Sequence, residues 1–385
     1  MTQHYDVAAV RQAFPAAEHV IYLDSGFQTP LSRPVKEAYE RFLQEGFESA
    51  GPKQVWLNRL EETRAKLARF IGAQPEAIAF TKNTSESMNI AANALPLRPG
   101  DKVLLIDQDH PNNAYAFLNL KKKGVEVAFI PMTEVIDAES FRPHIDARTR
   151  VISMSQVTFH AGHRFDVESV DHEVEALLLA EPADALDVNA INATFIGSGT
   201  HKGLLIPQGL GLLWWDTSRT ELEPAYMAAI SLAEPPADFI ARSDNMALAP
   251  SAGRFELGNF NLPAIQGLGA ALDLIDSIGV EKIQAHCFAL GDYLIACLDQ
   301  LDIGLVGPRE RRHRAPHIYV VALPPAEWLD YFTQSGIRVS PERDGIRVSL
   351  GMFNVTEDID RLIEAIRARN VPSEQARTAV LSKLG

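Results

Sequence analysis

Between about residue 55 and residue 215 the chain alternates helical stretches with short apolar runs. Residues 58–71 carry apolar side chains at helical spacing and stop at Gly72, and residues 77–80 then form a short apolar run. Strands that alternate with helices in this way are typical of a mostly parallel sheet with helices on both faces. This feature restricts that part of the chain to an α/β fold.

The pattern of apolar residues also divides the chain into two parts. Two long amphipathic segments, 263–278 and 280–301, lead into shorter strands and helices, which is typical of a smaller α+β unit. We therefore predict a large domain over residues 15–262 and a small C-terminal domain over 263–385, with residues 1–30 packing near the small one. Within the large domain, strands are expected at 103–106, 125–130, 151–154, 176–180 and 194–196, helices at 85–95 and 113–123, and an edge or antiparallel strand at 209–214.

Composition excludes several classes of function. The 385 residues include 50 acidic and 36 basic ones, for a formal net charge of -14, which would repel nucleic acids and anionic membrane surfaces. No apolar run approaches the roughly 20 residues of a membrane span, and the first residues lack a signal-peptide pattern. Two cysteines are too few for a disulfide framework or a thiolate metal site. We expect a cytoplasmic protein without a metal.

The most informative local pattern is the run 198–203, which places Lys202 among glycines just past an expected strand. Glycines let the backbone approach a ligand closely, and a lysine amine with a lowered pKa is a nucleophile. An ordinary turn lysine would leave the same pattern, so this run needs support from other segments.

Three other segments could bind a charged ligand. The run 80–86 passes from a strand through Thr84 and Ser85 into a helix, where N–H groups and hydroxyls would face an anion, although an ordinary helix cap by Asn83 or Thr84 fits equally well. His110 follows another strand, at the sheet edge where doubly wound folds bind ligands. Arg347 carries a guanidinium that can bind a carboxylate through two N–H groups. Arg338 stands in a nearly identical run of residues, and either arginine could be an ordinary surface residue.

In this order, these segments resemble the class V aminotransferase family, the pyridoxal phosphate (PLP) enzymes that include cysteine desulfurases, selenocysteine lyases and isopenicillin N epimerase. Residues 21–26 resemble the family's opening strand and residues 254–259 its RFE-x-GT segment, while residues 347–360 resemble its RxS, YN and E-x-D ending. The resemblance covers nearly the whole chain. It implies PLP fold type I, with PLP bound by the large domain.

The resemblance also implies a role for each matching residue. Lys202 would form the Schiff base with PLP and then move the proton at the substrate Cα, while His110 would stack on the cofactor ring. Arg347 would bind the α-carboxylate of an amino-acid substrate, with Ser25 and Gly26 as further substrate-binding residues. Asn259 would come from the partner subunit to the phosphate, which implies a homodimer. The remaining cofactor-binding residues would be Thr84, Ser85, Thr200 and His201 for the phosphate and Gln156 near the ring oxygen.

Two departures from the family pattern affect the chemistry. The family pairs an Asp with the pyridine nitrogen, which keeps the ring electron-accepting. Here Glu181 occupies that position and Asp184 the neighbouring Gln/His position, in a segment several residues shorter than usual, so Glu181 or Asp184 is the expected partner. Cysteine desulfurases also carry a persulfide-forming Cys before the RxS strand, and residues 335–344 contain none.

We therefore predict a PLP-dependent enzyme that acts at Cα or Cβ of an amino acid. Without the persulfide cysteine, it would be a C–S lyase, an epimerase or an aminotransferase. The alternative is a catalytically impaired homodimer of the same fold that acts as a binding protein. An unrelated α/β hydrolase is disfavoured, because the chain has no G-x-S-x-G motif.

Overall fold

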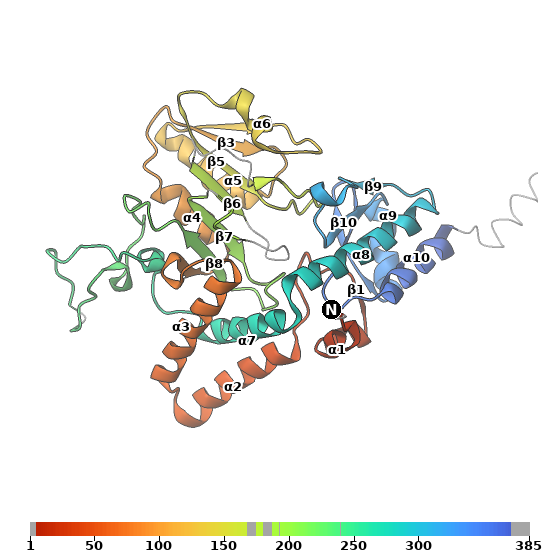
Figure 1. Cartoon of the computed structure of the whole chain (residues 1–385), viewed down its shortest axis with the longest axis horizontal. Coiled ribbons are helices and arrows are strands. Elements are labelled where there is room, and N and C mark those ends of the chain that lie inside the picture. Colours follow the sequence, from red (N-terminus) through yellow and green to blue (C-terminus); the bar gives the residue numbers. More distant parts are fainter. Residues whose placement is uncertain (1–4, 168–174, 180–186, 192, 239, 371–385) are drawn as a thin grey trace, which may run out of the picture.

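The structure is a computed structural model that describes residues 5–167, 175–179, 187–191, 193–238 and 240–370 (Figure 1). Within these residues, seven strands form the central sheet, in the order β2-β8-β7-β6-β5-β3-β4. Strand β8 is antiparallel to both of its neighbours, and the strands from β7 to β4 are parallel. The bounds are β2 (Ile78–Thr81), β3 (Lys102–Ile106), β4 (Glu126–Ile130), β5 (Thr149–Ser155), β6 (Glu175–Leu179), β7 (Phe195–Gly199) and β8 (Gly211–Trp215).

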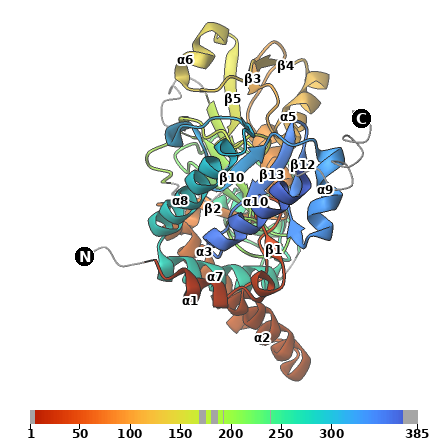
Figure 2. The ribbon, with the colours of Figure 1, turned by 90° about the vertical axis from the view of Figure 1, so that its right-hand side faces the viewer.

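Helices cover both faces of this sheet, as expected for a buried parallel sheet. Successive residues of β3 alternate between the two layers: Val103 and Leu105 belong to one core cluster, and Leu104 and Ile106 to the other. The first cluster includes residues of α4 (Thr84–Ala94) and α5 (Pro111–Leu118), and the second includes residues of α3 (Lys53–Phe70) and α7 (Leu262–Ile278). Helix α2 (Arg33–Ser49) packs on α7 and projects from the body, and the short α6 (Ala138–Phe141) lies beyond β4 in the chain (Figures 1 and 2).

A second sheet lies in the C-terminal part. Its order is β12-β13-β10-β9, all antiparallel. Helix α8 (Val280–Asp299) leads into it from α7, and the helices α9 (Pro325–Gln334) and α10 (Thr356–Asn370) share its apolar core. The strands are β9 (Leu305–Val306), β10 (Ile318–Val321), β12 (Ser340–Glu342) and β13 (Gly345–Ser349).

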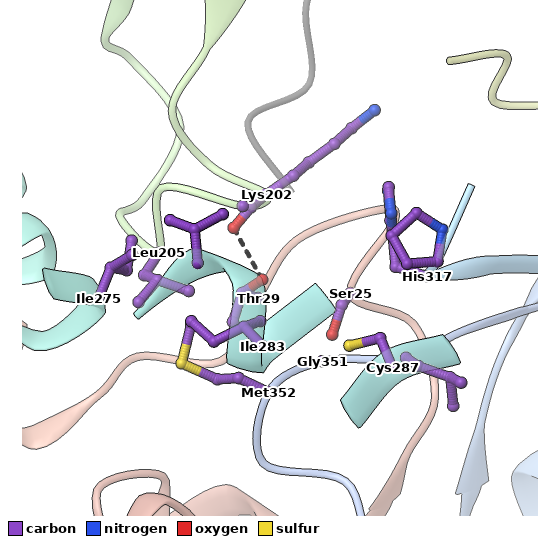
Figure 3. Close-up of a pocket in the computed structure, with 14 residues that line it drawn as sticks. Ser25, Thr29, Lys202, Leu205, Ile275, Ile283, Cys287, His317, Gly351 and Met352 are labelled. Atoms are coloured by element: carbon purple, nitrogen blue, oxygen red, sulfur yellow. Dashed lines mark hydrogen bonds between the residues drawn. The ribbon is translucent and has the colours of Figure 1, made fainter. Parts of the chain in front are cut away.

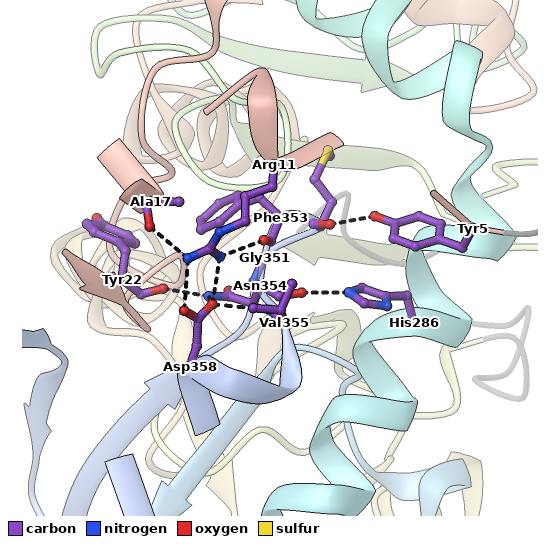
Figure 4. Close-up of polar contacts among 11 residues, drawn as sticks. Tyr5, Arg11, Ala17, Tyr22, His286, Gly351, Phe353, Asn354, Val355 and Asp358 are labelled. Atoms are coloured by element: carbon purple, nitrogen blue, oxygen red, sulfur yellow. Dashed lines mark hydrogen bonds and ion pairs between the residues drawn. The ribbon is translucent and has the colours of Figure 1, made fainter. Parts of the chain in front are cut away.

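The N-terminal segment lies on C-terminal elements. Strand β1 (Ile21–Tyr22) pairs in parallel with β11 (Ile337–Arg338). In helix α1 (Val7–Gln12), Arg11 donates to the carboxylate of Asp358 at 2.9 Å (Figure 4). Asp24 forms a parallel bridge with Ser349, so the chain that follows β1 is held beside β13.

The predicted α/β fold is confirmed, including the antiparallel direction of the run 209–214, which lies inside the sheet because β2 is the edge strand. The division into domains at residue 262 stays a prediction. Among the described residues, no helix has both the length and the apolar character of a membrane span.

Candidate active site

Lys202 lies in the loop between β7 and β8, and three contacts fix its backbone. Thr29 donates from its hydroxyl to the Lys202 carbonyl at 2.8 Å and from its N–H to the His201 carbonyl at 3.1 Å. The Leu205 N–H also donates to the Lys202 carbonyl, at 3.0 Å. In Figure 3 the side chain extends away from Thr29, so the amine points out of the apolar pocket that the Lys202 backbone helps to line. The lysine is therefore presented on a rigid loop.

The start of α4 lies against this loop. Asn83 is the N-cap, because its side chain accepts from the Glu86 N–H at 2.9 Å. The expected helix cap is therefore present, and Thr84 and Ser85 lie in the first turn of α4. A Cβ at Gly199 would be 3.0 Å from the Thr84 hydroxyl oxygen and 3.1 Å from the His201 ring. The glycine thus lets three segments converge: the start of α4, the end of β7 and the lysine loop. A helix N-terminus with a hydroxyl and an imidazole is a suitable phosphate site.

Thr200 is engaged differently. Its side chain is buried, and its hydroxyl donates to the Leu210 carbonyl at 2.7 Å, across the base of the loop. A hydroxyl has one proton to donate, so this bond uses the donor that a phosphate would need. Thr200 stabilises the loop in this structure.

His110 and Gln156 follow neighbouring strands of the sheet. His110 is the N-cap of α5, and its Nδ1 accepts from the Asn112 N–H at 3.1 Å. Its ring lies edge-on to Phe159, with the centroids 5.1 Å apart. Gln156 comes directly after β5; it is buried, and its Oε1 has no hydrogen-bond partner among the described residues. A buried amide oxygen without a donor is costly, so this atom fits a site that a ligand completes.

Arg347 lies on β13, between two carboxylates. Its Nη1 donates to Glu342 at 2.7 Å, and its Nη2 is 3.6 Å from Asp24. Burial raises the pKa of both carboxyl groups, and the nearby guanidinium acts in the opposite direction.

Three buried polar atoms near Arg347 lack a partner. The Arg347 Nε and the hydroxyl oxygens of Ser25 and Ser349 have no hydrogen-bond partner among the described residues. A Cβ at Gly26 would be 2.7 Å from the Ser349 oxygen and 3.3 Å from the Arg347 Nε, and a Cβ at Gly351 would be 2.8 Å from the Ser25 oxygen, so glycines leave open space beside all three atoms. One guanidinium edge with two hydroxyls is a donor set for a carboxylate.

The RFE-like segment has a structural function at its first and third positions. Arg254 is buried over the Trp215 ring at 4.6 Å, and Glu256 pairs with Arg64 at 2.8 Å. Asn259 adopts a left-handed backbone conformation with φ 50°, is exposed, and lines a surface pocket with Lys82 at the start of α4.

Two predicted residues lie outside the described part of the chain, namely Glu181 and Asp184. The strand before them, β6, pairs with β5 on one side and with β7 on the other. Glu342 was not predicted as a site residue, although it stands in the segment 335–344, which lacks the cysteine of the desulfurases. Its contact with Arg347 is formed across a hairpin, and no periodic pattern in the sequence announces it.

Comparisons with known proteins agree with this architecture. The model of the family "Aminotransferase class-V" matches residues 21–362. A probable cysteine desulfurase from Methanothermobacter thermautotrophicus is 32% identical over 309 residues, 76% of this chain and 76% of that protein.

Two solved structures share the fold. The apo cysteine desulfurase from Thermococcus onnurineus NA1 has a TM-score of 0.85 at 22% identity, over 95% of this chain and 98% of that one. The cystine C-S lyase C-DES, in complex with its product cysteine persulfide, has a TM-score of 0.83 at 20% identity, over 91% and 98% of the two chains.

This chain belongs to the class V aminotransferase family, and it is a PLP-dependent enzyme. Its residues fit the cofactor. The hydroxyl of Thr84 and the ring of His201 meet at a helix N-terminus, which suits the phosphate, and the unpartnered Gln156 oxygen follows β5, which β6 separates from β7 in the sheet.

Proposed function

We propose that this enzyme removes a proton from the Cα of an amino acid and works as a C–S lyase, without a persulfide cysteine. Epimerisation and transamination start from the same proton removal and are the other candidate reactions. The observation that carries the proposal is the presence of two polar sites, one where Thr84 and His201 converge at a helix N-terminus and one with the unpartnered atoms of Ser25, Ser349 and Arg347. They suit a phosphate and a carboxylate, the two anions that PLP and an amino acid bring.

When bound, PLP supplies an electron sink for the negative charge that develops at the substrate Cα. In this proposal Lys202 would hold the cofactor covalently until the amino group of the substrate displaces it, and the released amine would then move the proton at Cα. Thr84, Ser85 and His201 bind the phosphate, His110 covers the ring and Gln156 meets a ring substituent. Arg347, with Ser25 and Ser349 around Gly26, binds the substrate carboxylate. Thr200 would contribute its N–H or stabilise the loop, because its hydroxyl already has an acceptor.

We also infer a homodimer in the cytoplasm. The residue that resembles the family's intersubunit phosphate ligand, Asn259, is exposed in the single chain. The irregular segment before α7 extends away from the body and exposes large apolar side chains, as a subunit contact would require (Figure 1). They include Tyr226 at 67%, Ile240 at 60% and Met246 at 57% exposure.

The absorption spectrum of the protein reconstituted with PLP tests the proposed site. We expect a visible band of the lysine-bound cofactor in the wild type and in Lys121→Ala, an exposed-lysine control, and its loss in Lys202→Ala. Cysteine and related amino acids should perturb the wild-type band, and release of pyruvate and sulfide would identify the lyase.

Each part of the proposal can fail separately. A band that persists in Lys202→Ala would remove Lys202 from the site. A Lys202-dependent band that no amino acid perturbs would favour the binding-protein alternative. Proton exchange at Cα without elimination would favour the epimerase or the aminotransferase.

A further inference from the structure

The hairpin β12–β13 brings Glu342 to the substrate end of the proposed site. Ser340 pairs with Arg347 and Glu342 pairs with Gly345. Because side chains two residues apart on a strand share a face, Glu342 and Arg347 are diagonal neighbours on one side of the hairpin. Their contact is short, 2.7 Å between Nη1 and Oε1, and their side chains are only 7% and 9% exposed for Arg347 and Glu342. This is a buried charge pair.

Glu342 also interacts with the lysine end of the site. Burial raises the pKa of Glu342, and the positive charges of Arg347, His160 and Lys202 act in the opposite direction. In the proposed function the substrate Cα lies between the Lys202 amine and the Arg347 guanidinium. The 2.7 Å contact with Arg347 therefore places Glu342 at the substrate end of the site.

The hairpin tip is held on the large part of the molecule. His160 contacts Asp344 at 2.9 Å and lies 3.7 Å from the second oxygen of Glu342. Arg343 donates to the Gln108 side chain at 2.6 Å. These contacts restrain the tip from several directions, so Glu342 stays near the substrate position.

The charges around Arg347 do not balance once an amino acid binds. Asp24 and Glu342 already oppose this guanidinium, and the substrate α-carboxylate would be a third anion beside it. The α-carboxylate can be bound while Glu342 stays in place, because Glu342 occupies Nη1, whereas Nε and the hydroxyls of Ser25 and Ser349 are unpartnered. A buried excess of negative charge favours a ligand that brings a positive one.

We propose that Glu342 is a specificity-determining residue that selects amino acids with a cationic side chain and disfavours those with an acidic one. This inference rests on the proposed function, because it takes Lys202 and Arg347 as the two ends of the substrate position.

The test titrates the full-length holoenzyme with three amino acids of matched length: lysine, norleucine and 2-aminoadipate. The dissociation constants come from the change in the cofactor band, and the shift in thermal unfolding temperature gives a second readout. We expect the wild type to bind lysine about tenfold or more tighter than 2-aminoadipate, with norleucine between them. Glu342→Gln should reduce this preference to within about threefold, and Glu342→Asp should keep it. The control is Glu310→Gln, an exposed carboxylate paired with Arg312.

Several outcomes would overturn the inference. One is equal affinity of the wild type for lysine and 2-aminoadipate. This result would refute the inference even if Glu342→Gln does not fold. Another is a Glu342→Gln variant that binds all three ligands more tightly by the same factor, since Glu342 would then only compete with the α-carboxylate. If no amino acid perturbs the wild-type band at all, the proposed function fails as well, so the two failures are distinguishable.

Discussion

The buried ion pair between Glu256 and Arg64 offers a quantitative test of how the fold holds β2, the strand that leads into α4. One oxygen of Glu256 accepts from Arg64 at 2.8 Å and from the Phe80 N–H of β2 at 2.7 Å. The side chains of Arg64 and Glu256 are 8% and 3% exposed. The perturbation is Glu256→Gln, which keeps the shape and removes the charge.

Removing one partner of a buried pair costs about 3–5 kcal/mol, because the other charge stays buried without compensation. We expect the lower end, about 3 kcal/mol, for two reasons. The glutamine oxygen can still accept from Phe80, and Arg64 keeps a second carboxylate, Glu61, at 3.0 Å.

The assay is urea unfolding of the full chain, followed by the fluorescence of its four tryptophans, of which Trp214 and Trp215 lie on the neighbouring strand β8. Glu61→Gln is the matched control, because Glu61 contacts the same arginine but is 65% exposed. Its loss should cost less than about 1 kcal/mol, as for other exposed pairs. Equal losses in the two variants would refute the reasoning, since burial would then make no difference to the value of the pair.

Two further predictions concern a titrating side chain and a packed glycine. Burial lowers the pKa of His163 from 6.5 to about 4, so the unfolded chain binds the extra proton between these values. The free energy of unfolding should therefore rise with pH between about pH 4 and 6.5. His163→Gln should reduce the difference in unfolding temperature between about pH 5 and 7.5, and an unchanged difference would contradict the role of His163. On α8, a Cβ at Gly291 would overlap the Tyr319 hydroxyl, so Gly291→Ala should lower stability by about 1–3 kcal/mol or more. Gly46→Ala on α2, where the Cβ meets only Trp56 at 3.7 Å, should instead raise stability by about 0.5–1 kcal/mol. Equal changes in stability in the two variants would refute the packing argument.

The central sheet could be predicted because β2, β3, β5, β7 and β8 are mostly buried and stand out as apolar runs between helices. Helix α2 was not predicted, although Val35, Ala38, Phe42 and Leu43 follow helical spacing and the pattern was available in the sequence. Burial does not follow this pattern throughout, because only Val35 and Ala38 are buried, whereas Leu43 and Phe47 are 64% and 88% exposed. The two-residue strands β1 and β11 are too short for any periodicity, and their pairing joins distant parts of the chain.

The residues of the candidate site also differ in how far they could be predicted from the sequence. Lys202 and the start of α4 could be identified because glycines and small polar residues follow strands, which is a local pattern. The contact between Glu342 and Arg347, and the three unpartnered atoms near Arg347, depend on which segments the tertiary fold brings together. Local sequence does not contain that information. The interpretation of Glu181 and Asp184 stays a prediction.

The attachment of the N-terminal segment to C-terminal strands has a consequence for how the enzyme is made. The segment that carries Arg11, Asp24 and Ser25 leaves the ribosome first, but its partners Asp358 and Ser349 are synthesised more than three hundred residues later. Contacts of such large sequence separation form late, because a long loop must close before they contribute. The lysine loop and the phosphate end lie in segments that can fold while the ribosome is still at work. The substrate end cannot, so a nascent chain would be able to assemble its cofactor site before it has a place for the substrate.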